Sequence, residues 1–576
     1  MTTDTAPNRR LIKWFIGTAI FTFTVLLHVT FPNIGGSGLQ MPSNSAVWLG
    51  FALMMAIAMW PATRGVIRYS KFHIGLGLLL LALWLPFIWS WNEASLIALP
   101  RMFTVTAGAI LLLGLAQLQP TCRDWYWLGM AILLGVLLEA IYAIVQYYLL
   151  GPGLWLSYDP EYGRPFGVFQ QPNVLATFLT TGLVISARLM RDLRSRPLTV
   201  LASFAPLLIP LPVFLTYSRI GWLSFLIIVP ILLVYLFLTG RRQFIIWAGL
   251  LIIGILIAYV GLINIETSPR DPTSTNTVNL RIGKILHSIN MIMDKPVTGW
   301  GYGRFQHDFI NSLAEARASD AGVNLVITTN LSHPHNELLL WGIEGGLLPM
   351  TAMLCMGIYV MYRVFFSKLG KERIILFCLP LPLLLHSMTE LPFYHSTTHF
   401  LTFVLLLGFI VAVAEKTSTR DFRYTFSIKI GAFFATPLLL LFFATHLHTL
   451  FKIADYAYKI TESRDPLGDI INPFGMYRQL EFLQMSRQVN AGVAIGFTRA
   501  AEDYIHWAEE SKRLVPRPEL YYNLILAYRA LEDDAAVKRV ESEAEWLYPT
   551  FRSMYKNKRE DHAEAMEEIS SSISRP

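Results

Sequence analysis

The feature that most constrains this chain is a series of long apolar runs, each close to the length needed to cross a lipid bilayer. A helix needs roughly 20 apolar residues to span the hydrocarbon core of a membrane. Hydrophobic residues make up 54% of the 576 positions and charged residues only 15%, a balance that soluble domains seldom have. The pattern predicts an all-α, polytopic integral membrane protein with about thirteen spans: 11–31, 45–60, 74–90, 102–118, 126–149, 173–188, 199–215, 221–239, 243–263, 338–362, 374–392, 399–414 and 427–450. The first run is expected to be a signal anchor, because no small-residue cleavage site follows Phe31.

Lysine and arginine gather in alternate connections between these runs. The clusters are Arg9-Arg10-Lys13, Arg64/Arg68/Lys71, Arg188/Arg191/Arg194/Arg196, Arg241-Arg242, Arg363/Lys368/Lys371/Arg373 and Lys416/Arg420/Arg423/Lys429. Because basic residues mark the cytoplasmic side, the alternation predicts a cytoplasmic N-terminus. Only the 119–125 connection, with Arg123 alone, is weak. The opposite connections are then expected on the outer, periplasmic side: 32–44, 91–101, 150–172, 216–220, 264–337, 393–398 and the tail 451–576.

The net charge and the cysteine count limit the partners and the redox chemistry of the chain. Its net charge of +7 comes mostly from the basic topology clusters, so it gives no indication of nucleic-acid binding. Cysteine occurs three times, at Cys122, Cys355 and Cys378, and all three fall in predicted membrane or cytoplasmic positions. The outer regions therefore have no cysteines from which a disulfide framework could be built.

The topology divides the chain into four predicted parts. Residues 1–263 form N-terminal transmembrane helices, 264–337 a periplasmic loop, 338–450 C-terminal transmembrane helices, and 451–576 a periplasmic helical domain. In the tail, apolar residues recur at helical spacing and a Pro516-x-Pro518 break separates two helices. This pattern predicts a tetratricopeptide-like domain, with a small helical cap of no binding role as the alternative. The residues concerned are Ala500, Ala501, Tyr504, Ala508, Leu520, Leu524, Ala527 and Leu531.

A polar motif, Ser332–Glu337, ends the long outer loop immediately before the apolar run that begins at Leu338. Histidine exchanges protons near neutral pH, and this motif contains His333 and His335. A proton-handling cluster at a bilayer surface suggests chemistry on a substrate that is partly lipid. Metal binding by the two histidines would need further ligands, which are scarce nearby in the sequence, so neither a metal nor another cofactor is expected.

Four arginines lie in connections that are predicted to face outward, where basic residues are disfavoured: Arg101, Arg164, Arg219 and Arg281. The planar guanidinium group suits phosphate oxygens. A headgroup contact would explain any single one of them, but several on the side that carries the histidines favour an anionic substrate.

Amide side chains form a second polar cluster, Gln170, Gln171 and Asn173, at the start of a predicted span. Amides at this position either cap the helix or hydrogen-bond the hydroxyls of a sugar. The glycine-rich segment 299–303 lacks the lysine and the spacing of a nucleotide-binding loop, and it is interpreted as a tight turn.

Together these motifs resemble the O-antigen ligase and polymerase superfamily. The resemblance is closest to bacterial protein O-oligosaccharyltransferases, which glycosylate pilins and other periplasmic proteins. It is carried by four segments and covers nearly the whole chain: His333-Pro334-His335-Asn336-Glu337 followed by Glu344-Gly345-Gly346, Phe166–Asn173, Gly299–Gly303, and Glu390-Leu391-Pro392-Phe393-Tyr394. The soluble helical tail also fits this subgroup better than it fits a lipid A-core ligase.

The resemblance implies transfer of a glycan from an undecaprenyl-pyrophosphate carrier to a serine or threonine hydroxyl, at the outer face of the inner membrane. The partners would be the lipid-linked oligosaccharide donor, an acceptor protein such as a pilin, and membrane lipid, with no nucleic acid. His335 is assigned as the base, with His333 as the alternative, and Arg219 and Arg281 are assigned to the pyrophosphate. Further substrate contacts are assigned to His333, Asn336, Gln170, Gln171, Asn173, Arg164, Arg101, Tyr394 and Glu390.

Three other functions stay open at this point. A glycan polymerase or a lipid A-core ligase would use the same donor with a sugar hydroxyl as acceptor. A transporter or flippase should have charged or broken helices at the middle of the bilayer, and the ionisable residues there are few, such as Glu139 and His386. A scaffold would use its outer helical domain to recruit partners.

Overall fold

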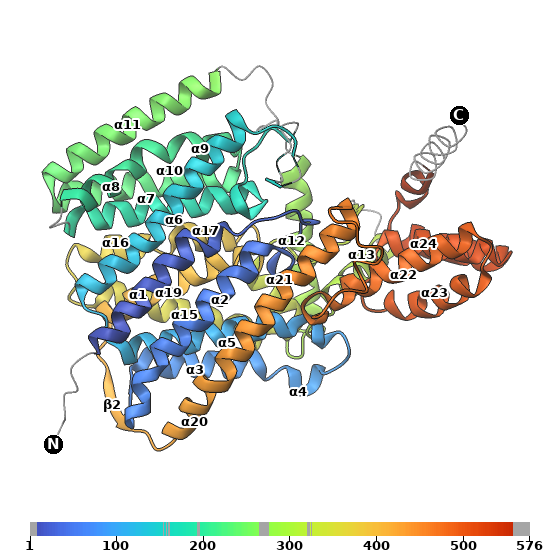
Figure 1. Ribbon diagram of the computed structural model, residues 1–576, viewed down its shortest axis with the longest axis horizontal. Coiled ribbons are helices and arrows are strands. Elements are labelled where there is room, and N and C mark those ends of the chain that lie inside the picture. The colour runs from blue at the N-terminus through green and yellow to red at the C-terminus, as the bar shows by residue number, and fades with distance from the viewer. Residues whose placement is uncertain are drawn as a thin grey trace. The chain divides into compact units, whose positions relative to one another are not determined.

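The computed structural model describes residues 8–153, 155–156, 158, 162–192, 196–263, 276–319, 323 and 325–556. Almost all regular structure in these ranges is α-helical, which confirms the predicted all-α class (Figure 1). Some predicted features lie outside the described residues: Arg194 of one basic cluster, positions 264–275 of the outer loop, and positions 557–576 of the tail.

The helices form two compact units, each assembled from stretches that are distant in the sequence. Unit 1 comprises Met1–Trp84, Pro100–Ser274 and Thr351–Met476. Unit 2 comprises Leu85–Leu99, Thr275–Met350 and Tyr477–Pro576.

In the described residues, twelve helices are long and apolar enough to cross a membrane, so the chain is a multi-pass membrane protein. They are Arg9–His28, Pro42–Arg64, Lys71–Ser90, Ser95–Leu118, Cys122–Leu149, Pro172–Arg191, Leu198–Leu215, Arg219–Thr239, Arg241–Ile263, Leu347–Phe366, Thr397–Ala414 and Thr425–Tyr458.

Two of the predicted spans differ from the structure. The segment 374–392 is not one long helix but two short ones, α16 (Glu372–Cys378) and α17 (Leu381–Ser387), separated at Leu379-Pro380. Proline lacks the backbone N–H and clashes with the preceding turn, so it interrupts a helix even in a fully apolar run. The segment 338–362 is divided at Gly346, whose φ of +80° ends α14 (Glu337–Gly345) before α15 (Leu347–Phe366) begins. Hydropathy does not register either break.

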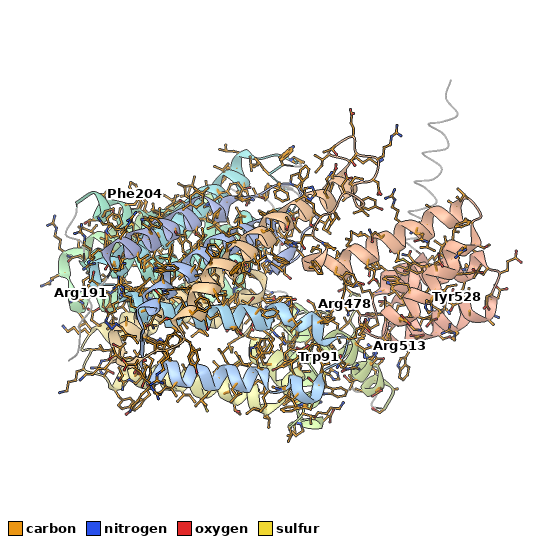
Figure 2. The ribbon with its side chains drawn as sticks, turned by 60° about the horizontal axis from the view of Figure 1, so that its bottom comes forward. Trp91, Arg191, Phe204, Arg478, Arg513 and Tyr528 are labelled. Carbon is orange, nitrogen blue, oxygen red and sulfur yellow. The ribbon has the colours of Figure 1, made fainter. Side chains whose placement is uncertain are left out.

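The helices between Arg9 and Ile263 belong mainly to unit 1, and α7 is the most enclosed of them. In its candidate span 89% of the residues are buried, because α7 packs against α6, α8, α10 and α17. In contrast, α11 and α8 expose apolar side chains such as Phe204, as expected for lipid-facing helices (Figure 2). The bounds are α1 Arg9–Thr24, α2 Pro42–Met59, α3 Lys71–Trp84, α4 Phe87–Ser90, α5 Ser95–Leu118, α6 Cys122–Leu149, α7 Pro172–Asp192, α8 Arg196–Leu208, α9 Pro210–Leu215, α10 Arg219–Thr239 and α11 Arg241–Ile263.

Connections that were predicted to share the cytoplasmic side contact one another in unit 1. Strand β1 (Val66–Tyr69) pairs antiparallel with β2 (Ser418–Asp421), with Arg68 opposite Thr419. Three further contacts involve five more segments predicted on this side: Arg9 with Asp124 at 2.9 Å, Arg191 with Glu372, and Lys371 with the carbonyl oxygen of Leu238, just before Arg241-Arg242, at 2.7 Å. Such contacts are expected between connections that share a side, and the orientation of that side stays a prediction.

The remaining helices complete the two units, with α18 to α21 in unit 1. In unit 2 the tail helices α22 to α25 pack in sequence, and α13 packs on α25. Arg317 of α13 donates to the carbonyl oxygens of Trp546 at 2.9 Å and Leu547 at 2.8 Å. The bounds are α12 Asn276–Asp294, α13 Phe305–Ser319, α18 Pro392–His395, α19 Thr397–Ala414, α20 Thr425–Ile430, α21 Thr436–Tyr458, α22 Tyr477–Ala494, α23 Thr498–Ser511, α24 Pro518–Ala530 and α25 Asp534–Leu547.

The apolar residues predicted at helical spacing in the tail lie in its helical hairpins. All of the predicted core positions are buried except Leu531, which is half-buried. Pro518 begins α24, and the hydroxyl of Tyr548 donates to the carbonyl oxygen of Pro516 at 2.5 Å, which fixes the break between α23 and α24. The tetratricopeptide-like character of the domain stays a prediction.

Candidate functional site

The amide motif of unit 1 lies at the start of the enclosed helix α7. Pro172 is the first residue of this helix, which suits its fixed φ angle. The Gln171 side chain accepts a hydrogen bond from the backbone N–H of Asn173 at 2.6 Å, so Gln171 is the amide of this cluster that caps the helix. The Asn173 side chain instead accepts a hydrogen bond from the Ser218 hydroxyl at 2.8 Å. This bond links the amide motif to the turn that precedes α10.

Two of the predicted arginines meet at that same turn. Arg164 donates from Nε to the carbonyl oxygen of Thr216 at 2.7 Å. Arg219 is the half-buried first residue of α10, next to Ser218, whose hydroxyl caps the helix by accepting from the N–H of Gly221. The structure thus brings Arg164, Asn173 and Arg219 together around the turn 216–218.

Buried polar groups hold the loop before α7 in place. Glu139 and Gln146 of α6 accept hydrogen bonds from the backbone N–H groups of Val168 (3.1 Å) and Gly167 (2.8 Å). His395 of α18 approaches the carbonyl oxygen of Phe169 at 3.0 Å, and burial lowers the pKa of this histidine. The imidazole is therefore neutral near pH 7, and its Nε2–H donates to the carbonyl group.

The two mid-membrane ionisable residues that could have suggested a transporter have structural partners. Glu139 lies 3.2 Å from His28, and His386 lies 2.8 Å from the Thr177 hydroxyl. Buried polar groups paired in this way stabilise helix packing, so they do not by themselves indicate a transport path.

Three other predicted substrate residues belong to unit 1. Arg101 is buried in α5. Glu390 follows α17, and its N–H donates to the carbonyl oxygen of His386 at 2.9 Å. Tyr394 is in α18 and is 37% exposed, so its phenol is accessible.

The two motif histidines of unit 2 lie beside each other before α14, and both are partly exposed. Their ring centroids are 4.8 Å apart, and the backbone N–H of His335 donates to Nδ1 of His333 at 3.2 Å. His335 has a φ of +60°, in the left-handed region that is uncommon for residues other than glycine, although asparagine, aspartate and histidine adopt it more often than the rest.

Lys284 contacts His335, the proposed base. Sequence reasoning did not identify this lysine. Its ammonium group lies 3.3 Å from Nε2 of His335. Because an ammonium group has only donors, Nε2 is the accepting nitrogen and the proton of the neutral ring is on Nδ1. Arg281 precedes Lys284 by three residues on α12, so both side chains share one face of this helix. The structure therefore brings Arg281 to the face of α12 that meets His335.

Most of the other polar residues of this motif have structural roles. Asn336 caps α14 by accepting from the N–H of Leu339 at 3.1 Å, and Glu337 accepts from the indole N–H of Trp341 at 3.1 Å. Glu344 accepts from the N–H groups of Gly303 (3.0 Å) and Phe305 (3.3 Å), so it holds the predicted glycine turn. The partly exposed histidines are left as the proton-handling groups of the motif.

Backbone strain coincides with the motifs. Among the described residues, six that are not glycine have positive φ: Gln119, Gln170, Tyr217, His335, Lys459 and Glu532. Gln170, Tyr217 and His335 lie in the amide motif, the arginine turn and the histidine motif. Strained conformations of this kind cluster at functional sites, which supports the choice of these three segments.

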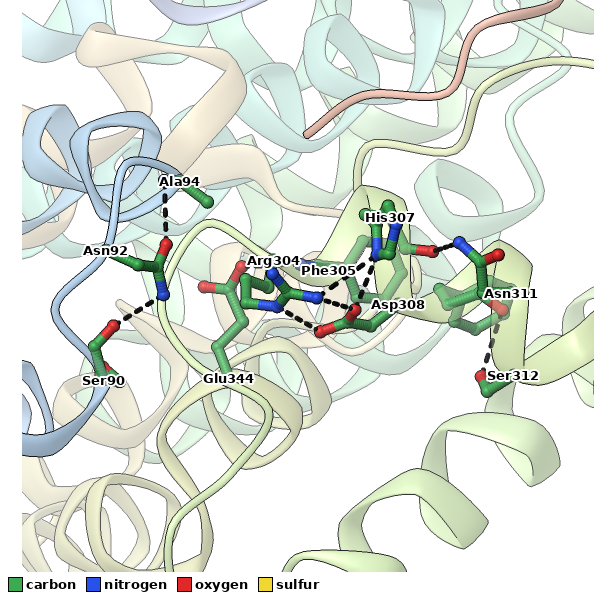
Figure 3. Close-up of polar contacts among 11 residues, drawn as sticks. Ser90, Asn92, Ala94, Arg304, Phe305, His307, Asp308, Asn311, Ser312 and Glu344 are labelled. Atoms are coloured by element: carbon green, nitrogen blue, oxygen red, sulfur yellow. Dashed lines mark hydrogen bonds and ion pairs between the residues drawn. The ribbon is translucent and has the colours of Figure 1, made fainter. Parts of the chain in front are cut away.

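A second group that sequence reasoning missed is Arg304, His307 and Asp308 of unit 2 (Figure 3). Nε and Nη2 of Arg304 donate to Asp308, at 2.8 and 2.6 Å, and Nδ1 of His307 lies 2.8 Å from the same carboxylate. Burial of Asp308 would raise its pKa, but the hydrogen bonds from His307 and Arg304 lower it below the usual carboxyl value. The i, i+3, i+4 spacing of these residues was the available signal.

We expect Asp308→Asn to destabilise the protein by about 2 kcal/mol at neutral pH, because a buried charge-assisted network is lost. A lowered folded-state pKa means that this stabilisation is complete above the unfolded carboxyl pKa of about 4 and is lost as the pH falls through the folded value. Thermal melting of both proteins across that range is the measurement. The difference should shrink at acidic pH, and a pH-independent difference would contradict the ionic network. The exposed Asp503→Asn is the control.

Three family models match segments that contain these residues. One described as a protein glycosylation ligase matches residues 165–189, which include the amide motif. One described as an O-antigen ligase matches 204–354, which include Arg219, Arg281 and His335. One described as the C-terminal part of a virulence factor membrane-bound polymerase matches 374–559, which include the tail helices.

A curated relative, the general O-oligosaccharyltransferase of Acinetobacter baylyi, is 23% identical over 393 residues, or 65% of this chain. The match spans 62% of that relative, which is less than two thirds of its length.

The fold defines a multi-pass membrane protein. Its segments are similar to O-antigen ligases and protein glycosylation ligases, which supports the resemblance that its motifs predicted.

Proposed function

We propose that this protein is an O-linked oligosaccharyltransferase. It moves a glycan from undecaprenyl pyrophosphate to serine or threonine hydroxyls of periplasmic proteins such as pilins. The observation that carries the proposal is the partly exposed His335, held in a strained backbone conformation with Lys284 at its Nε2, inside the segment that the O-antigen ligase model matches.

His335 is the proposed base. The acceptor hydroxyl attacks the anomeric carbon of the first sugar, its proton passes to the imidazole, and the bond from that carbon to the pyrophosphate oxygen breaks. Lys284 occupies the Nε2 lone pair in the resting geometry. The Nζ–Nε2 contact must therefore open when the acceptor binds, which leaves the ammonium group available to the departing pyrophosphate. His333 is the alternative base, because its ring packs against that of His335.

Cationic groups stabilise the charge that develops on the leaving pyrophosphate. Arg219 and Arg281 are proposed for this role, with Arg164 and Arg101 as secondary candidates. Support for Arg219 comes from its first position in α10, since a helix N-terminus also favours anions. Asn173, Gln170, Gln171 and Tyr394 are proposed to orient the glycan or the acceptor, and Glu390 to contribute at the same place.

The proposed orientation follows from charge. The connections that carry the basic clusters are proposed to face the cytoplasm, so that the histidine motif, the arginines and the tail face the periplasm. The helical tail is then available to an acceptor protein, in the role of a tetratricopeptide-like module.

The direct test is co-expression of this protein with a lipid-linked glycan pathway and a candidate pilin, followed by intact-mass measurement of the pilin. The expected result is a mass increase equal to the whole glycan, lost when the acceptor serines are replaced by alanine. An unmodified pilin, with the donor present and the enzyme in the membrane, would contradict the proposal.

The match of residues 374–559 to a membrane-bound polymerase favours a second candidate, glycan polymerisation with a sugar hydroxyl as acceptor. In the same cells, polymerase activity would lengthen the lipid-linked glycan into a ladder of repeat units. Lipid-linked glycans of one length together with a modified pilin would exclude polymerase activity.

A further inference from the structure

Unit 2 contains a pocket of about 360 Å³ that none of the motifs above accounts for. Three indoles line it, from Trp89 and Trp91 on one segment and Trp300 in the glycine turn. Trp91, labelled in Figure 2, is 62% exposed, and Trp89 is 44% exposed. Two aromatic faces open to solvent are costly unless they bind something, whether lipid or ligand.

Hydrogen bonds hold the walls of this tryptophan pocket rigid. The indole N–H of Trp89 donates to the carbonyl oxygen of Thr298 at 3.0 Å, and that of Trp300 donates to the carbonyl oxygen of Met291 at 2.8 Å. Backbone N–H groups of Trp300 and Gly301 donate to the carbonyl oxygens of Ile343 and Glu344. A pocket whose aromatic faces are fixed before binding avoids the entropy cost of ordering them.

Polar groups stand beside the aromatic faces. The Asn92 side chain is fixed by bonds to the carbonyl oxygen of Ser90 (2.8 Å) and the N–H of Ala94 (2.8 Å), as Figure 3 shows. The Lys295 ammonium group lies 3.8 Å from the centre of the Trp300 ring and has donors to spare. The Ser90 hydroxyl has no partner among the described residues.

This combination fits a sugar ring better than it fits a lipid tail. A pyranose has an apolar face of C–H groups, which packs on an aromatic face, and hydroxyls at its edge, which need fixed donors and acceptors. A lipid tail would use the indoles and leave the Lys295 ammonium group and the Ser90 hydroxyl without a counterpart.

The pocket is also joined to the histidine motif by a rigid element. Glu344, near the C-terminal end of α14, holds the turn that carries Trp300, and His335 immediately precedes the N-terminal end of α14. At 1.5 Å per residue, nine residues of helix separate the two ends by about 13 Å. That span corresponds to a few sugar units.

We propose that the tryptophan pocket binds a pyranose ring of the glycan, a few units away from the anomeric carbon that reacts. The inference rests on the proposed function, because it takes the glycan of the lipid donor as the ligand. It adds a subsite that selects or holds the distal part of that glycan.

The test combines a binding and a kinetic measurement on the full chain in lipid nanodiscs. The binding probe is the reducing oligosaccharide released from the lipid donor by mild acid, followed by saturation-transfer NMR. The variant is Trp91→Ala, whose exposed side chain can be removed with little effect on folding. The control is Trp60→Ala, a tryptophan of unit 1 that is 44% exposed and also lies near the end of a candidate span.

Trp91→Ala should weaken glycan binding and raise the KM for the donor roughly 3- to 10-fold, the effect of one lost aromatic contact, while kcat is kept. Trp60→Ala should leave both unchanged. Trp89→Phe, which keeps a ring but loses the bond to Thr298, should have an intermediate effect. Unchanged glycan binding by Trp91→Ala would overturn the proposal, as would failure of the wild type to bind the probe.

Two further outcomes separate the alternatives. Equal loss of donor affinity in Trp91→Ala and Trp60→Ala, or Trp91-dependent binding of undecaprenyl phosphate without a glycan, would identify the indoles as lipid anchors and overturn the proposal. Trp91-dependent glycan binding by a wild type that transfers nothing to any acceptor would support the pocket while the proposed function fails.

Discussion

Replacement of His335 by asparagine is expected to reduce glycan transfer by roughly 10²- to 10⁴-fold, the usual contribution of a general base. Asparagine is a sharper substitution than alanine because His335 has a φ of +60°. The left-handed conformation costs alanine about 1–2 kcal/mol, so His335→Ala would keep the backbone strain, whereas asparagine adopts this conformation more readily. His335→Asn therefore removes the imidazole and leaves the loop before α14 unstrained. The measurement is the initial rate of pilin modification at a fixed amount of enzyme in the membrane.

Two comparison variants give this experiment its meaning. His506 is exposed in α23, so His506→Ala should transfer at the wild-type rate. His333→Ala should keep measurable activity, because His335 retains its imidazole. If His333→Ala is inactive and His335→Asn is active, the base is His333. Wild-type transfer by both single variants would remove the histidine motif from the chemistry altogether.

Arg219→Lys is expected to lower kcat/KM for transfer about 10- to 100-fold, the range for losing a hydrogen bond to a charged group. Lysine keeps the charge but not the planar pair of donors that matches two pyrophosphate oxygens. Removal of an interaction that strengthens as the pyrophosphate departs should appear mainly in kcat.

Arg241 provides a matched control for this variant. It is the first residue of α11 as Arg219 is the first residue of α10, but it is exposed and lies in a connection proposed to face the cytoplasm. Arg241→Lys should therefore transfer normally. Equal rates for Arg219→Lys and the wild type would assign Arg219 to packing of the turn 216–218.

The membrane fold was predictable because hydropathy identifies the membrane-spanning helices and basic residues indicate which connections share a side. Long apolar runs identified the helices, and the basic connections that were expected to share a side do contact one another, as the pairing of Arg68 with Thr419 illustrates. The breaks at Leu379-Pro380 and Gly346 were not predicted. Composition averaged over a window hides a single residue that interrupts helical hydrogen bonding.

The candidate site was predictable where it resembles a family motif, and less so where three-dimensional neighbours matter. The sequence did not tell which amide caps α7; it is Gln171, because capping depends on which side chain reaches the free N–H groups, while Asn173 bonds Ser218. Lys284 reaches His335 from 51 positions upstream, a separation over which sequence gives no signal. Only contacts that recur at helical spacing, such as those of Arg304 with Asp308, leave a local pattern.

The small sheet of unit 1 has a consequence for how the protein is made. About 350 residues separate β1 from its partner β2. At a synthesis rate of about 5–20 residues per second, β1 waits roughly 20 to 70 s for β2 to emerge. Throughout that interval Val66–Tyr69 presents an unpaired strand edge, which is a template for aggregation. The sheet closes only after nearly every span has been synthesised, so its closure distinguishes a finished chain from a truncated one that quality-control proteases should remove.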